Sequence, residues 1–123
     1  MDENLIRGLK GIEYVEALFR FGSRSTGKGL KPYSDTDLCV ITNRKISLSE
    51  KAKVHSLVFS DDIDLVFFQD LPLHIKYRVF AEGEMLFVKN ESFLREIRRG
   101  VILMYFDFRT TLRRHCERVL NGR

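Results

Sequence analysis

The sequence predicts an α/β (α+β) fold, in which a mixed, mainly antiparallel sheet of about four strands carries flanking helices, mainly on one face. Three observations predict it. The chain has 123 residues, 44% of them hydrophobic, which suffices for one stable core, so we expect a single domain over 1–123. Short apolar runs rich in β-branched and aromatic residues occur at four places. Helix signals lie between them, which gives the order α, β, loop, β, α, β, α, β, α.

The first two predicted elements are a helix and a strand. Residues 2–10 predict a short helix, because Asp2 can cap its start, its leucines and isoleucine share one face, and Gly11 ends it. In residues 15–21 apolar side chains alternate with charged ones. This period of two predicts a strand with one covered face.

The middle of the chain contains a loop, a strand and a helix. Residues 22–34 include three glycines and a proline, which predicts a loop. The run Asp-Leu-Cys-Val-Ile at 37–41 predicts a buried strand. The sequence Ser-Leu-Ser-Glu, from Ser47 to Glu50, is a capping box and opens a helix that reaches about residue 58.

The second half repeats this alternation. An apolar run at 63–68 predicts a third strand, and a proline followed by a glycine bounds a helix over about 71–83. Residues 84–88 predict a short fourth strand. From Asn90 almost to the end, apolar residues recur every three or four positions, which predicts a long helix.

The composition excludes several classes of protein. The longest apolar run, Val101–Phe106, has six residues, whereas a membrane span needs about 20. The first residues are acidic and lack the apolar core of a secretory signal. Cys39 and Cys116 have neither disulfide-framework nor zinc-site spacing. We therefore expect a reduced, cytoplasmic protein with no membrane contact.

The charge is uneven along the chain. The net charge is +4, and residues 89–123 contribute nine basic and four acidic side chains. Such a tail can attract nucleic acid or an acidic partner, or it can be a solvated helix face.

Two carboxylates, Asp35 and Asp37, lie two positions apart at the start of a predicted strand. Residues so spaced share one face of a strand, about 6.6 Å apart, where two carboxylates repel each other unless a cation lies between them. Magnesium fits, because it prefers oxygen ligands and keeps water or phosphate in its other positions. The same spacing recurs at Asp62 and Asp64, so the strand context, rather than the spacing, indicates a metal site.

Asp64 interrupts the otherwise apolar strand 63–68. If this strand lies beside strand 37–41, Asp64 becomes the third carboxylate of the same cluster, with Asp62 as an outside candidate. The alternative is a solvated residue at a strand end.

A third candidate feature follows the first strand. After Phe21 the chain reads Gly22-Ser23-Arg24, which can offer backbone N–H groups, a hydroxyl and a guanidinium to phosphate. The alternative is an ordinary turn. A phosphate site that faces three carboxylates and two divalent ions suits the transfer of a nucleoside monophosphate to a hydroxyl, with pyrophosphate leaving.

These motifs together carry a resemblance to a known family. The set resembles the signature of the polymerase-beta-type nucleotidyltransferase superfamily, and the length resembles its minimal nucleotidyltransferases, the MNT family. A helix that ends in Glu-Gly before a strand resembles their downstream segment, so the similarity runs from about residue 12 to residue 115. Ser25 departs from the alanine that is common there. The matching residues are Gly22-Ser23-Arg24-Ser25-x-Gly27 and Ser34-Asp35-x-Asp37-Leu38.

The resemblance implies a polymerase-beta-like fold, two Mg²⁺ ions and ATP as substrate. It implies that Asp35, Asp37 and Asp64 bind the metals and that Gly22 and Ser23 bind the triphosphate, with Arg24 nearby. We expect Asp64 to act as, or help, the general base toward the acceptor hydroxyl.

The resemblance also implies a partner. MNT proteins are often paired with a HEPN-type ribonuclease toxin and act as antitoxins that transfer AMP to a tyrosine of the toxin. Two alternatives stay open: a non-catalytic antitoxin that neutralises a toxin by binding it, and a nucleic-acid-binding module that uses the basic C-terminal helix. The sequence has no nucleic-acid-binding motif, and it leaves the oligomeric state open.

One segment of the last helix bears on the partner. Val101–Phe106 is apolar all around the helix, which predicts either a partner-binding surface or a central helix buried on several sides. Arginines follow it in a basic strip at Arg109, Arg113 and Arg114.

Overall fold

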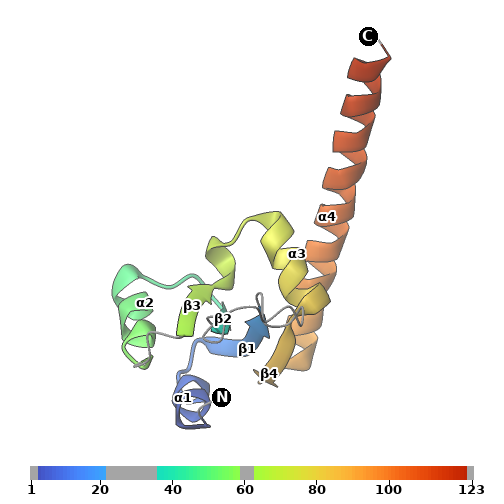
Figure 1. Ribbon diagram of the computed structural model, residues 1–123. Helices are drawn as coiled ribbons and strands as arrows, with labels where there is room; N and C mark the ends of the chain where they lie inside the picture. Colours follow the sequence, from blue (N-terminus) through green and yellow to red (C-terminus); the bar gives the residue numbers. More distant parts are fainter. Residues whose placement is uncertain (1–2, 22–35, 59–62, 122–123) are drawn as a thin grey trace.

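The computed structural model describes residues 3–21, 36–58 and 63–121 (Figure 1). The expected order of helices and strands is confirmed, with one short 3₁₀ helix added after the third strand. The elements are α1 (Glu3–Lys10), β1 (Val15–Phe21), β2 (Thr36–Thr42), α2 (Leu48–His55), β3 (Ile63–Phe67), η2 (Phe68–Asp70), α3 (Leu73–Glu82), β4 (Glu84–Val88) and α4 (Glu91–Leu120).

The four strands form one mixed sheet in the order β3-β2-β1-β4. β1 pairs antiparallel with both β2 and β4, while β2 and β3 are parallel. The prediction of a mixed, mainly antiparallel, four-stranded sheet is confirmed. The parallel pair requires a crossover, which α2 supplies between β2 and β3.

Helices cover both faces of the sheet, so the expectation that they lie mainly on one face is wrong. Leu9 of α1 and Val54 of α2 belong to the apolar core on one face. Val79 of α3 and Val101 of α4 belong to the core on the other face. The physical reason lies in β2, where the four residues from Leu38 to Ile41 are all fully buried. A central strand with two apolar faces needs cover on both.

The expectation that β1 is covered on one face is wrong for the same reason. Its five residues from Val15 to Phe19 are all buried. An irregularity in the pairing with β2 falls between Val15 and Ala17 and places these two side chains in opposite cores. Glu16 is buried too, and its Oε1 accepts a hydrogen bond from Asn43 Nδ2 at 3.3 Å. The charged residue that looked like a mark of a solvated face is therefore a hydrogen-bonded interior group.

The helix-start signals are confirmed. Ser47 is the N-cap of α2: its hydroxyl accepts from the Glu50 backbone N–H, and the Glu50 carboxylate accepts from the Ser47 N–H at 2.7 Å. Asn90 caps α4, since its Oδ1 accepts from the Phe93 N–H at 3.1 Å. Pro72 is the N-cap of α3. Asp2, the expected cap of α1, lies outside the described residues.

The long helix α4 has 30 residues, and only its first part packs on the sheet. Leu94 and Val101 are buried, and the Tyr105 ring stacks on Tyr77 of α3 with centroids 4.0 Å apart. Beyond this contact the helix extends away from the rest of the described chain (Figure 1). Leu103, Met104 and Phe106 are exposed. The alternative prediction, that this segment is a central helix buried on several sides, is therefore wrong. None of the helices in the described ranges is long and apolar enough to cross a membrane.

Candidate active site at the ends of three strands

Three strand ends meet on one side of the sheet. Because β1 runs antiparallel to β2, and β2 parallel to β3, the end of β1 lies beside the beginnings of β2 and β3. The pairing aligns Phe21 with Asp37, and Asp37 with Asp64. The condition that the sequence left open is therefore met, since the strand that carries Asp64 is the direct neighbour of the strand that carries Asp37.

The two aspartates occupy the same face of the sheet. Side chains two residues apart in a strand lie on the same face of the sheet. Asp37 therefore shares a face with Cys39 in β2, and Asp64 shares a face with Val66 in β3. Cys39 and Val66 both belong to the core beneath α3 and α4. Neighbouring strands lie about 4.8 Å apart, so the two backbone positions are close enough for both carboxylates to reach one cation. Asp37 is half-buried and Asp64 is exposed.

The remaining predicted site residues, Gly22, Ser23, Arg24 and Asp35, lie outside the described residues, as does Asp62, the outside candidate for the cluster. The chain connects them to this place. Gly22 directly follows Phe21, the last residue of β1, and Asp35 directly precedes Thr36, the first residue of β2.

The side-chain oxygen atoms of Asp37 and Asp64 are suitable ligands for magnesium. Both are carboxylate oxygens, the ligand type that this ion prefers, and magnesium binds through one or two carboxylates plus substrate phosphates and water. Within residues 3–21, 36–58 and 63–121, no group of three or more His, Cys, Asp or Glu side chains could hold a metal ion. Among the described residues, Asp37 and Asp64 are thus the two candidate metal ligands at this place, and Asp35 stays a predicted third.

Cys39 is the nearest nucleophilic residue type on this face, two positions along β2 from Asp37. Its side chain is fully buried, and burial raises the pKa of the thiol to about 12, against a small opposing effect of the Lys76 ammonium. At neutral pH the group is a neutral thiol that fills space, as expected from the sequence.

Sequence reasoning missed Lys76 of α3. This half-buried lysine lies over the same sheet face, with its Nζ 5.3 Å from the centroid of the Phe68 ring. Its charge also acts on Cys39. A signal was present, because Lys76 falls between Leu73 and Phe80 on the apolar face of its helix. It adds positive potential to the face that carries the two aspartates.

Gly83 fixes how closely α3 and β4 approach this end of the sheet. A Cβ atom at this position would lie 2.3 Å from the carbonyl oxygen of Val79 and 3.3 Å from that of Arg20. Directly after it, Glu84 begins β4 and forms an ion pair with Arg20, one residue before the end of β1. The Glu-Gly sequence thus has a structural role beside the candidate site.

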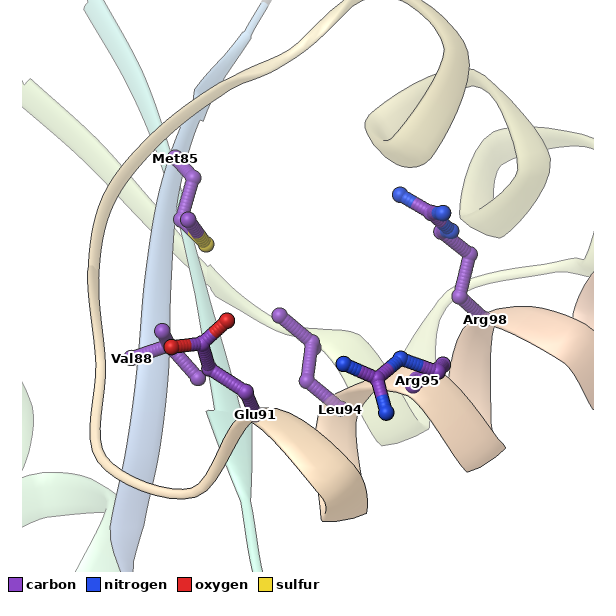
Figure 2. A pocket seen from close by; sticks show the side chains of 6 residues that line it. All are labelled: Met85, Val88, Glu91, Leu94, Arg95 and Arg98. Atoms are coloured by element: carbon purple, nitrogen blue, oxygen red, sulfur yellow. The ribbon is translucent and has the colours of Figure 1, made fainter.

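A pocket of about 180 Å³ lies on the same face but beyond β1, between β4 and α4. Figure 2 shows Glu91 and Arg95 facing Met85 across it, with the Arg98 guanidinium above. Two guanidiniums, one carboxylate and an apolar wall suit an anionic group with an apolar body. The residues that line it are Met85, Val88, Glu91, Leu94, Arg95 and Arg98.

Comparison with known proteins places this geometry in a family. The family described as Polymerase beta, Nucleotidyltransferase, matches residues 3–92, which include all the predicted site residues. A comparison with curated proteins gives no match.

Solved structures share the fold over nearly the whole chain. A toxin–antitoxin structure with AMP-PNP is 22% identical, with a TM-score of 0.71, and the match covers 98% of this chain and 99% of the other. A complex of tri-AMPylated Shewanella oneidensis HEPN toxin with MNT antitoxin gives 20% identity and a TM-score of 0.68, and the match covers 96% of this chain and 95% of the other. A toxin–antitoxin MntA–HepT structure is 19% identical, with a TM-score of 0.67, and the match covers 96% of each chain. At this identity the likeness shows the fold, including the long terminal helix.

Proposed function

Because the chain belongs to the polymerase beta nucleotidyltransferase family, we propose that it transfers AMP from ATP to an acceptor hydroxyl. One observation carries the proposal: Asp37 and Asp64 are register partners on one sheet face, beside the strand end that leads into Gly22 and Ser23. This register supports the proposal, because the transfer requires carboxylates that hold metal ions beside a site for the triphosphate.

The proposed reaction is a substitution at the α-phosphorus of ATP. The acceptor oxygen forms a bond to the α-phosphorus of ATP, the bond from that phosphorus to the bridging oxygen breaks, and pyrophosphate leaves. Asp64, the exposed member of the pair, takes the proton of the acceptor hydroxyl or helps to orient it. Gly22 and Ser23 bind the β- and γ-phosphates, and Arg24 offers a guanidinium.

Asp35, Asp37 and Asp64 would hold two magnesium ions. Bound there, magnesium lowers the pKa of the attacking hydroxyl and stabilises the leaving pyrophosphate. We place the reaction in the cytoplasm, where ATP is available and an exposed thiol such as Cys116 stays reduced.

The acceptor that we propose is a tyrosine hydroxyl of a HEPN-type toxin, so that the chain acts as an antitoxin. The proposal is supported by the full-length likeness to toxin–antitoxin structures, one of which holds AMP-PNP and another a tri-AMPylated HEPN toxin.

The test is the transfer of label from ATP to protein in an extract of the source cell, with magnesium present. Label on the α-phosphate should enter a protein, whereas label on the γ-phosphate should not, because it leaves with pyrophosphate. Asp37→Asn should lose the transfer while its circular dichroism spectrum and melting stay those of a folded protein. Incorporation of γ-label would contradict nucleotidyl transfer and indicate a kinase-type reaction.

A second candidate function is neutralisation of a toxin by binding alone. The exposed apolar side chains of α4 favour it, because they provide a surface that needs no chemistry. Full neutralisation by a doubly substituted Asp35→Asn/Asp37→Asn protein would support this candidate over catalysis. The third alternative, a nucleic-acid-binding module, gains no support from the family match or from these structural neighbours.

A further inference from the structure

An apolar stripe continues along α4 after the helix has left the sheet. Its members are Met104, Phe108, Leu112 and Val119, which are 60%, 54%, 49% and 60% exposed. We call these four residues the α4 stripe. At 100° per residue they lie on the same side of the helix as Leu94 and Val101, which pack into the core. The stripe thus extends an established packing face into solvent.

The spacing of the stripe suits a helical partner. From Leu94 to Leu112 the apolar positions follow one another at intervals of three and four residues, the pattern of a helix that packs along another helix. Every described residue from Thr111 to Asn121 is exposed. A helix of this kind owes most of its stability to packing of its apolar side, so a continuous apolar side with no cover indicates an interaction surface.

The charges beside the stripe determine which partner fits. Residues 108–120 contain four arginines and one glutamate. Arg109 follows Phe108 and Arg118 precedes Val119, so they lie about 100° to either side of the stripe. Asp107, which precedes Phe108, lies on the same border as Arg118. Glu117, two positions before Val119, falls on the opposite side of the helix. The arginines outnumber Asp107 and Glu117 along this part of the helix, so its net positive charge attracts an acidic partner and opposes a second copy of this chain.

We propose that the α4 stripe binds an acidic amphipathic helix of the acceptor protein, with the acidic side chains of that helix beside Arg109 and Arg118. This inference rests on the proposed function, because it names the surface that holds the acceptor of the transfer. None of the stripe residues belongs to the strands that carry Asp37 and Asp64. Binding of the acceptor and transfer to it can therefore be removed separately.

The test uses a designed helical peptide as the probe, with leucines at intervals of three and four residues and glutamates on both borders. Its affinity for the full chain is measured by fluorescence anisotropy. A control peptide carries lysines in place of the glutamates. We expect the acidic peptide to bind at least about tenfold more tightly than the control, with a difference that shrinks as salt is raised.

Variants of the chain assign the site. The double substitution Phe108→Ser/Leu112→Ser should weaken binding of the acidic peptide about tenfold or more. Leu48→Ser is the matched control, because Leu48 is 83% exposed on α2, and it should leave binding unchanged. Both variants should keep the ATP affinity and melting temperature of the parent, which shows that they fold.

Three results would overturn the inference: equal affinity for the two peptides, unchanged binding by the stripe variant, or a dimer of the chain alone that the stripe substitutions abolish. The last would assign the surface to a second copy. Asp37→Asn should bind the peptide like the parent chain. Failure of the transfer and failure of the docking are therefore separate results.

Discussion

The position of Asp64 in the sheet makes it a candidate for a chemical role. Its side chain is exposed, as the alternative of a solvated residue near a strand end also expects, so its exposure alone assigns it no role. Its strand pairs in parallel with β2, in the register that sets it beside Asp37 on the same face. A pair of carboxylates in that arrangement is useful where a cation is bound, and this makes Asp64 a candidate ligand.

The two cysteines should differ sharply in reactivity. Cys116 is exposed, whereas Cys39 is buried and its thiol pKa is raised to about 12. Since the thiolate is the reactive form, at pH 8 a disulfide reagent such as DTNB should modify Cys116 rapidly and Cys39 only after unfolding. The measurement is the number of thiols titrated before and after denaturant. Modification of both thiols at equal rates in the folded protein would contradict the burial of Cys39.

Glu50 should give the protein an acid-sensitive helix start. The side-chain hydrogen bond from Arg44, followed by the backbone hydrogen bond from Ser47, lowers the pKa of Glu50 from 4.5 to about 2. A carboxylate with a lowered folded-state pKa stabilises the fold above its unfolded pKa, and this contribution is lost as the pH falls through about 2. Glu50→Gln should therefore lower the melting temperature at pH 7, and the difference should vanish near pH 2. A difference independent of pH would show that the charge of Glu50 is not involved.

At the scale of the elements, two glycines should respond in opposite ways to alanine. At Gly83 the added Cβ would meet the Val79 carbonyl oxygen at 2.3 Å, a backbone atom that cannot move aside freely. We expect Gly83→Ala to destabilise the fold by about 1–3 kcal/mol. At Gly100, in the interior of α4, nothing lies within 4 Å of the added atom. We expect Gly100→Ala to stabilise it by about 1 kcal/mol, through helix propensity.

Chemical denaturation of the two variants and the parent protein measures both effects. Equal effects of the two substitutions would mean that the close approach of α3 to β1 at Gly83 does not constrain the fold.

Local signals in the sequence predicted the elements well. The capping box at Ser47 and the cap at Asn90 fix two helix starts, because capping depends on a few adjacent residues. Strand neighbours and covered faces depend on residues far apart in the chain. The alternation of β1 therefore suggested one solvated face, while the structure buries Glu16 through a hydrogen bond from Asn43. For the same reason, the partnership of Asp37 and Asp64 could be stated from the sequence only as a condition.

At the scale of the whole molecule, the two proposed activities occupy different parts. The candidate active site lies where the ends of β1, β2 and β3 meet, and the α4 stripe lies on the part of α4 that extends beyond the sheet (Figure 1). Between these two parts, α4 packs against α3 through the stacked rings of Tyr77 and Tyr105. We expect this packing to hold the extended helix at a fixed angle to the sheet, so that a bound acceptor is presented consistently.

The most direct test of the central claim, that Asp37 and Asp64 form one site, is the initial rate of α-label transfer from ATP. It is measured for the parent chain, Asp37→Asn, Asp64→Asn and the double variant, with the acceptor found in the extract. Asp70→Asn is the matched control, because Asp70 is an exposed aspartate beyond the opposite end of β3. We predict that each single substitution lowers the rate at least about 100-fold and that the double variant is no slower than the slower single one, since groups that act as a unit are not additive. Transfer at the parent rate by folded Asp64→Asn, or single effects that multiply in the double variant, would contradict the shared site.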